Sequence, residues 1–193
     1  DLGSLNEKIQ SVSGKVDSVM TSVNRVMQLN EKIIALLAQL DGKIPGSPAS
    51  DLIAQLQAEN QRHQELLNSL QAGNAGIGNA AQTAANTAQQ IGSLVRENQQ
   101  QLRGIKGNFE QNVLPGLNTS LDSFGQLSGK LSGVLSGVDP LVDQTKGVLD
   151  QLNTSLNDSK TALESTGKAL QKVQDQLNTV SADLNALRNS QSY

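Results

Sequence analysis

Residues 2–40 read LGSLNEKIQSVSGKVDSVMTSVNRVMQLNEKIIALLAQL, and this stretch decides the fold. Its apolar residues recur at alternating steps of three and four, which places them in one narrow line along the side of an α-helix. We call such a line a seam. The spacing predicts a first helix over residues 1–41, about 60 Å long. Its seam consists of Leu2, Leu5, Ile9, Val12, Val16, Val19, Val23, Val26, Asn30, Ile33, Leu37 and Leu40.

A loop follows at residues 42–50, where the sequence GKIPGSPAS carries Gly and Pro residues that end a helix and redirect the chain. A second seam then predicts a long helix over residues 51–111, about 85 Å if fully helical. The middle of this helix is weak, because each of Gly73, Gly76 and Gly78 costs about 1 kcal/mol of helix propensity relative to Ala. We therefore expect fraying or a local break there. The second seam consists of Ile53, Leu56, Asn60, His63, Leu67, Leu70, Asn74, Ile77, Ala81, Ala84, Ala88, Ile91, Val95, Asn98, Leu102, Ile105 and Phe109.

A third segment covers residues 112–193 and begins where the seam slips by one residue between Phe109 and Leu114. Pro115 lies at the slip, and proline is tolerated in a helix only in the first turn. The sequence therefore predicts a second reversal or a sharp kink at the segment VLP.

The remaining residues keep one seam as far as residue 187, which predicts a third long helix over residues 115–188. Pro140 lies inside it, yet Val138 and Val142 stay in phase across the proline, which favours a kink over a reversal. The seam consists of Leu117, Leu121, Phe124, Ser128, Leu131, Leu135, Val138, Val142, Thr145, Leu149, Leu152, Leu156, Ser159, Leu163, Thr166, Leu170, Val173, Leu177, Val180, Leu184 and Leu187. A stripe of small residues at every fourth position either seats a close neighbour or softens the rod; it consists of Gly125, Gly129, Gly133 and Gly137.

The composition agrees with seams on polar helices, since 36% of the residues are hydrophobic and only 2% are aromatic. A chain so poor in large rings cannot build a wide compact core. We predict an all-α fold, an elongated antiparallel coiled coil or helical bundle with long helices. A net charge of −3 with both signs scattered argues against nucleic-acid binding. The absence of Cys excludes thiol nucleophiles, disulfides and thiolate metal sites, and no apolar run approaches the ~20 residues of a membrane span.

Polar residues inside the seams are the first candidates for functional sites. His63 is the only histidine, and without carboxylates at ligand spacing a structural role is favoured over metal binding or proton relay. Asn30 sits at a seam position where a lone Asn usually fixes register and partner number. Other polar residues at seam positions indicate that the seams pack loosely and are only moderately stable; they are Asn60, Asn74, Asn98, Thr145 and Thr166.

Catalytic chemistry has no constellation in this sequence. Serine catalysis needs a base, and the sole imidazole lies on a seam. Asp139 and Asp143 are spaced four apart, but early in a helix they more plausibly complement its dipole than form an acid and base pair. The triplets at Asn118 and Asn153 fit glycosylation acceptors but are common by chance in an Asn- and Ser-rich chain. We predict a protein that is not an enzyme, with no cofactor and no metal, and we assign no partner-binding residue.

Three stretches resemble a known family: NVLPGLN at residues 112–118, LSGVLSG at residues 131–137 and QLNTSLNDSKTALESTGKALQKVQDQL at residues 151–177. They are similar to the extracellular helical region of YhgE/Pip proteins, the phage infection proteins of Gram-positive bacteria, which are related to the type VII secretion component EsaA. The resemblance implies a membrane-anchored surface protein with an exposed helical stalk that bacteriophage can use as a receptor. It supplies no catalytic motif and no phage-contact residue.

The leading expectation is therefore a non-enzymatic extracellular coiled-coil stalk at the cell membrane of a Gram-positive bacterium. We expect the stalk to be a homodimer. Its protein partner would be a phage tail protein or an envelope component. The chain opens at Asp1 without Met, so we interpret it as a piece of a longer protein whose membrane segments lie outside it. The first alternative is a scaffold subunit of a secretion or envelope complex. The second is an amphipathic binder of lipid surfaces, although narrow seams flanked by Gln and Asn fit helix packing better.

Overall fold

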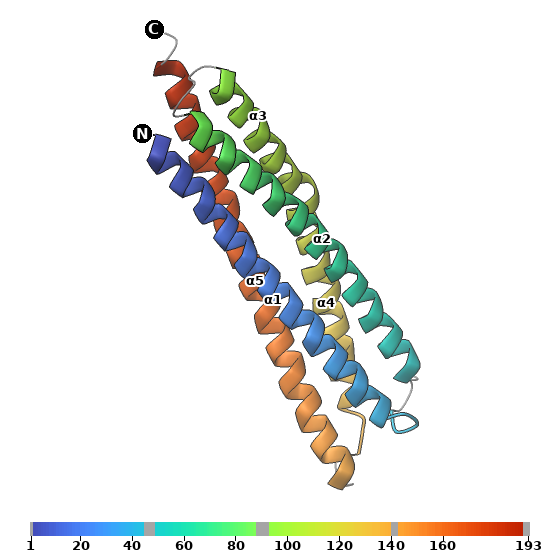
Figure 1. Cartoon of the computed structure of the whole chain (residues 1–193). Coiled ribbons are helices and arrows are strands. Elements are labelled where there is room, and N and C mark those ends of the chain that lie inside the picture. The colour runs from blue at the N-terminus through green and yellow to red at the C-terminus, as the bar shows by residue number, and fades with distance from the viewer. Residues whose placement is uncertain (1, 45–48, 88–92, 140–142, 191–193) are drawn as a thin grey trace. The chain divides into compact units, whose positions relative to one another are not determined.

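The computed structural model describes residues 2–44, 49–87, 93–139 and 143–190, which form helices joined by short turns, with no strand among them. The predicted all-α class is confirmed. In chain order the elements are α1 (Leu2–Gln39), α2 (Ala49–Thr87), α3 (Ser93–Asn108), the π-helix η1 (Phe109–Val113), α4 (Leu114–Leu135) and α5 (Asp143–Ser190), as Figure 1 shows.

The chain divides into two compact units. Unit 1 comprises Asp1–Thr21, Leu67–Pro115 and Gly167–Tyr193, and unit 2 comprises Ser22–Leu66 and Gly116–Thr166. Helices α1, α2 and α5 contribute residues to both units, whereas α3 and η1 belong to unit 1, and α4 belongs to unit 2 from Gly116 onward. Each unit is therefore a helical bundle with its own interior.

The predicted second helix over residues 51–111 is wrong, because α2 ends at Thr87 and α3 runs back along it within unit 1 (Figure 1). Nδ2 of Asn98 donates to the backbone oxygen of Ala80 at 2.7 Å. The glycines predicted to break the helix lie inside α2 and make room for α3. A Cβ at Gly73 would lie 3.0 Å from Cε2 of Phe109, and one at Gly76 would lie 3.3 Å from Cγ1 of Ile105.

The reversal predicted as one alternative at Phe109–Leu114 is wrong, because the backbone stays helical through this segment. The N–H of Leu114 donates to the oxygen of Phe109, and this i to i+5 bond makes one π-helical turn. A π turn takes up one residue more than an α turn, which accounts for the one-residue slip in the seam. Phe109 and Val113, the first and last residues of η1, are both buried. The missing N–H of Pro115 interrupts the regular ladder at the same place.

The sequence predicts one helix over residues 115–188 with a kink near Pro140. The structure instead has two helices, α4 and α5, and the chain reverses between them. Helix α4 ends at Leu135 in a turn where the N–H of Val138 donates to the oxygen of Leu135 at 3.1 Å. Helix α5 then runs back along α4 within unit 2 (Figure 1). The steps of three and four are the same on both sides of a turn, so phase alone does not distinguish a kink from a hairpin. Pro140 and Val142 lie outside the described residues.

The seams of α1 and α5 are buried as predicted, at every position whose side chain the structure describes. In α2, however, a neighbouring line of residues is buried as well, spaced seven apart: Leu52, Glu59, Leu66, Gly73 and Ala80. It replaces the predicted positions Ile53, Asn60 and Asn74, which are only half-buried. A helix that packs against several neighbours buries a wider stripe than the two-position seam of a coiled coil.

The core of unit 2 is a continuous apolar cluster; its buried members are Val26, Ile33, Leu36, Leu37, Leu40, Leu52, Leu56, Phe124, Leu127, Leu131, Leu135, Val138, Leu149, Leu152, Leu156 and Leu163. The glycine stripe of α4 lies outside this core. A Cβ added at Gly125, Gly129 or Gly133 would meet no described atom within 4 Å, so these glycines seat no neighbour within the described chain.

Candidate functional site

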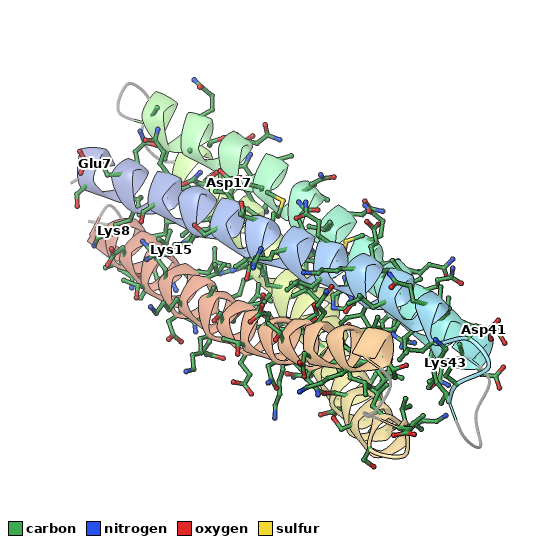
Figure 2. All side chains as sticks on the ribbon, turned by 90° about the horizontal axis from the view of Figure 1, so that it is seen from below. Glu7, Lys8, Lys15, Asp17, Asp41 and Lys43 are labelled. Carbon is green, nitrogen blue, oxygen red and sulfur yellow. The ribbon has the colours of Figure 1, made fainter. Side chains whose placement is uncertain are left out.

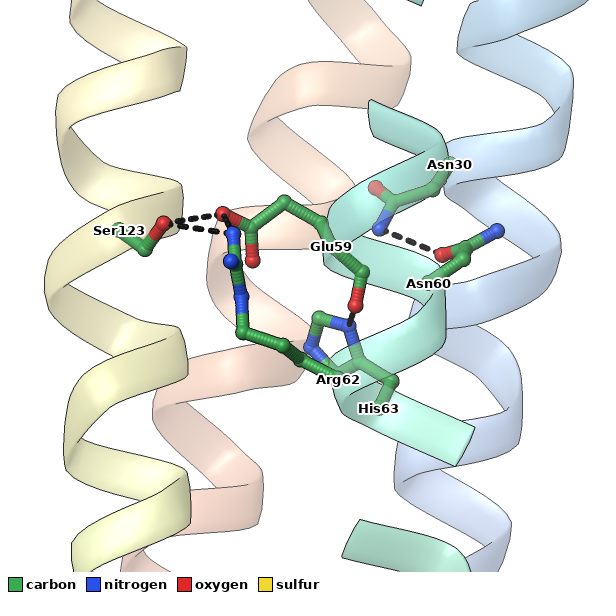
Figure 3. Close-up of polar contacts among 6 residues, drawn as sticks. All are labelled: Asn30, Glu59, Asn60, Arg62, His63 and Ser123. Carbon is green, nitrogen blue, oxygen red and sulfur yellow. Dashed lines mark hydrogen bonds and ion pairs between the residues drawn. The ribbon is translucent and has the colours of Figure 1, made fainter. Parts of the chain in front are cut away.

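The most unusual feature of unit 2 is a set of buried and half-buried polar side chains, which we call the polar layer. It links all four helices of the unit, and Figure 3 shows six of its members. The polar layer consists of Asn30, Glu59, Asn60, Arg62, His63, Ser123 and Ser159.

One half of the polar layer joins α1, α2 and α5 through neutral groups. Nδ2 of Asn30 donates to Oδ1 of Asn60 at 3.0 Å, and Nδ2 of Asn60 donates to the backbone oxygen of Met27 at 3.2 Å. The hydroxyl of Ser159 donates to Oδ1 of Asn30 at 3.2 Å. Since Asn30 is fully buried, every one of these bonds replaces a contact with water. Asn30 thus joins α1 to α2 and α5, and its role in fixing helix register stays a prediction.

The other half joins α2 and α4 through charged groups. The side chain of Glu59 is only 2% exposed and forms an ion pair with the guanidinium of Arg62, which is 40% exposed. Ser123 of α4 donates its hydroxyl proton to Oε1 of Glu59 and accepts a bond from Nη2 of Arg62 at 2.9 Å (Figure 3). A buried carboxylate is tolerated only with such partners, because losing its hydration costs several kcal/mol.

His63 lies one helical turn beyond Glu59 and is fully buried. Nδ1 of its ring lies 2.6 Å from the backbone oxygen of Glu59, an acceptor, so Nδ1 carries the proton. Nε2 is buried without a hydrogen-bond partner. Burial lowers the pKa of His63 below its ordinary 6.5; Arg62 acts in the same direction, and the Glu59 carbonyl and carboxylate oppose it.

Beside the charged half lies a surface pocket of about 300 Å³, lined by Gln55, Glu59, Arg62, Ser123, Gln126, Leu127 and Lys130. Ser123 is bonded to Glu59 and Arg62, and the imidazole to a backbone carbonyl, so the structure does not couple hydroxyl and imidazole as a nucleophile and its base. What the arrangement does is hold four helices in one register.

The structure distributes the other candidate residues between the two units. Asn74 bridges Ser13 and Asp17 in unit 1, and the amide of Asn98 bonds α2. In unit 2, Thr166 donates to Ser22 at 2.8 Å, and Thr145 is buried.

The remaining candidates do not belong to the polar layer. Asn118, Asn153 and Asp139 are exposed. The side chain of Asp143 is not among the side chains that the structure describes.

Glu59, Arg62 and Ser123 were not candidates in the sequence. Glu59 and Arg62 flank two seam positions, Asn60 and His63, but a charged residue beside a polar seam position does not single them out, since Glu31 and Glu97 share this pattern and are exposed. Ser123 precedes the seam residue Phe124 and is one of many serines, and nothing in its spacing marks it.

Unit 1 presents its charges on the outside. Figure 2 shows Lys8 and Lys15 reaching from α1 toward α5, where they bond Asp183 and Gln176, while Asp17 lies on the side of α2. Within the described part of the chain, no three His, Asp or Glu side chains gather in a way that would hold a metal ion.

Comparison with known proteins adds no family: no family model matches the chain, and no curated protein matches it. None of the helices that the structure describes is long and apolar enough to cross a membrane.

Proposed function

We propose that the chain is a non-enzymatic extracellular stalk of a membrane-anchored surface protein of a Gram-positive bacterium, which bacteriophage use as a receptor. The proposal rests on the resemblance of residues 112–118, 131–137 and 151–177 to YhgE/Pip proteins. Its membrane anchor would be formed by segments of the same protein outside this chain. The physiological partner would be a protein, contacted through the polar faces of the helices.

The structural observation that supports the proposal is the interior of unit 2, where the polar layer interrupts the apolar packing. Buried polar contacts fix which helices pair and in which register, at some cost in stability. A stalk needs this property, since it presents a defined surface and has no pocket chemistry to perform. The apolar side chains of the seams are buried inside the units, which leaves little apolar surface to enter a lipid layer.

An elongated antiparallel coiled coil is the finer architecture we propose for the stalk. A helix of 48 residues such as α5 is about 72 Å long. Small-angle scattering of the purified chain would then show an elongated particle whose longest dimension is at least the roughly 72 Å of α5. A particle with a gyration radius near 18 Å would instead indicate a compact domain and would overturn this architecture.

Receptor use is tested by competition. The purified chain is added to Gram-positive host cells carrying the full-length protein, and phage adsorption is measured. We expect the folded chain to reduce adsorption, whereas a Leu152→Pro variant, which breaks α5 inside unit 2, loses this effect. If the folded chain leaves adsorption unchanged but captures a secretion component from the cell envelope, the scaffold function is correct instead. Flotation with neutral liposomes would favour the lipid-surface alternative.

We also propose that the stalk is a homodimer. The seams of α1 and α5 are covered within each unit, so the dimer would use another face of the helices. Sedimentation equilibrium should give twice the chain mass of 20.4 kDa. A single species at the monomer mass up to high concentration would exclude the dimer without affecting receptor use.

A further inference from the structure

We propose that the polar layer is a proton-operated catch: protonation of His63 opens the contact between α2 and α4 in unit 2, while unit 1 keeps its structure. The inference does not depend on the stalk function, because it concerns only the polar layer within one unit.

The buried ring of His63 has no hydrogen-bond acceptor in position for a second proton. The ring is fully buried, Nδ1 is committed to the Glu59 carbonyl, and Nε2 has no hydrogen-bond partner. A proton on Nε2 therefore adds a charge and an unpaired donor to the interior at once. A buried donor without an acceptor and a buried unpaired charge are both strongly unfavourable.

The acceptor that α2 itself supplies is Oε2 of Glu59, one helical turn away, which is also buried and without a partner. To reach the protonated ring the carboxylate has to turn, and this displaces Oε1, the oxygen that bonds Ser123 and Arg62. The hydrogen bond from Ser123 is the direct link of Glu59 to α4. Protonation of His63 thus either leaves a bare charge inside unit 2 or breaks the bond between α2 and α4, and both outcomes favour opening.

Among the described residues of unit 2, no further charge lies buried beside the ring. Glu59 and Arg62 on α2 are the charged groups that act on the ring, and they act in opposite directions. The polar side chains that the other helices contribute to the layer are neutral, namely Asn30 on α1, Ser123 on α4 and Ser159 on α5. The nearby charged residues of those three helices are exposed: Arg25, Glu31 and Lys32, Asp122 and Lys130, and Asp158, Lys160 and Glu164.

The direction of the pH effect follows from linkage. Burial lowers the pKa of His63 in the closed unit below 6.5, whereas in the opened unit the ring returns to its ordinary value. The open state then binds more protons, so lowering the pH below 6.5 favours opening. The opening constant rises by up to about tenfold per pH unit until the pKa of the closed unit is reached. Above pH 7 the effect is absent.

Unit 1 is the internal control, because the chain has a single histidine. Its buried polar side chains are the amides Asn98, Gln99 and Gln174, which do not titrate. A general loss of stability at low pH would affect both units, whereas the catch affects unit 2 alone.

The test is amide hydrogen exchange of the intact chain between pH 7.5 and pH 5, expressed as protection factors so that the chemical pH dependence of exchange cancels. We expect protection to fall in residues 52–66 and 117–131, with residues 70–84 and 98–109 unchanged. An NMR titration of the single imidazole in the same wild-type chain should give a midpoint below 6.5. Equal loss of protection in both units, unchanged protection in unit 2, or a midpoint at or above 6.5 would overturn the proposal.

The matched variant is His63→Gln, which keeps a polar side chain but cannot take up a proton. We expect its unit 2 protection to be independent of pH over the same range. If the pH step persists in this variant, the titrating group is not His63 and the proposal fails. The wild-type titration decides the question even if the variant does not fold, since it requires no substitution.

Discussion

Units 1 and 2 draw on the same three helices, α1, α2 and α5, yet they bury different chemistry. Among the described residues, the buried polar side chains of unit 1 are neutral amides that bond between helices, such as Asn98 to α2 and Gln174 to Glu110. Unit 2 buries a carboxylate and an imidazole, and a four-helix network surrounds them. The apolar seams therefore determine how the helices pair in both units. Single polar residues, on a seam or beside it, determine whether the stability of a unit depends on pH.

Each unit buries one phenylalanine, and this gives the largest test of their independence. Phe109 in unit 1 is 0% exposed and Phe124 in unit 2 is 1% exposed. Truncation of either to Ala should cost about 3–5 kcal/mol through lost burial and the cavity left behind. Urea unfolding measures the total loss, and hydrogen exchange localises it. We expect Phe109→Ala to expose unit 1 first and Phe124→Ala to expose unit 2 first; loss of both units together in both variants would show that they unfold as one.

Loss of the buried ion pair should have the next largest effect. Arg62→Met leaves the carboxylate of Glu59, 2% exposed, with only Ser123 as a partner. Because the guanidinium is 40% exposed, we expect a loss of about 2 kcal/mol, below the 3–5 kcal/mol of a fully buried pair. Urea unfolding provides the measurement.

The matched control in unit 1 is Lys106→Met, which removes a pair with Glu110 whose side chains are 35% and 47% exposed. Here the loss should be below about 0.5 kcal/mol. The double variant Arg62→Met with Glu59→Gln should recover most of the stability, since no buried charge remains. Equal losses for Arg62→Met and Lys106→Met would contradict the contrast between the two units.

Glycines test how closely α3 approaches α2 in unit 1. A Cβ at Gly73 would lie 3.0 Å from the ring of Phe109, whereas one at Gly78 meets nothing within 4 Å. Gly78→Ala should stabilise the chain by up to about 1 kcal/mol through helix propensity. In Gly73→Ala the contact with the ring offsets that gain, and we expect a net loss of about 1 kcal/mol. Thermal unfolding of both variants gives the sign, and Gly129→Ala on the open face of α4 should follow Gly78→Ala. Stabilisation by Gly73→Ala would show that the ring moves aside freely.

How far the sequence predicts this fold depends on the helix. The seams of α1 and α5 predict most of their buried faces; the exceptions, buried beside the seam, are Leu29 and Leu36 in α1 and Ser155 and Gln174 in α5. Seam phase failed between α2 and α3 and between α4 and α5, because a hairpin preserves the steps of three and four. The slip beside Pro115 was a real signal, and the structure accommodates the extra residue in a π turn.

The site was predictable only in part. Asn30, Asn60 and His63 are seam positions, so their burial or half-burial follows from the periodicity, whereas the bond between Asn30 and Asn60 also depends on how α1 and α2 pair. Glu59 is buried because α2 packs on a wider stripe than the seam, and this depends on how many helices surround it. Its partner Ser123 comes from α4, and that pairing is a property of the tertiary structure alone.

The smallest effect should come from the ion pair on the outside of unit 1. Nζ of Lys8 lies 2.7 Å from Oδ2 of Asp183, but the side chains are 43% and 41% exposed. Water and salt screen such a pair, so Lys8→Met should cost about 0.2–1 kcal/mol in dilute buffer and nothing measurable in 1 M NaCl. A double-mutant cycle with Asp183→Asn isolates the coupling.

The same cycle on Glu59 and Arg62 should keep most of its coupling in 1 M NaCl, because the carboxylate is closed off from the solvent. If both couplings vanish with salt, Glu59 is reached by solvent in the folded chain, and the distinction between a charged interior in unit 2 and a charged surface on unit 1 disappears.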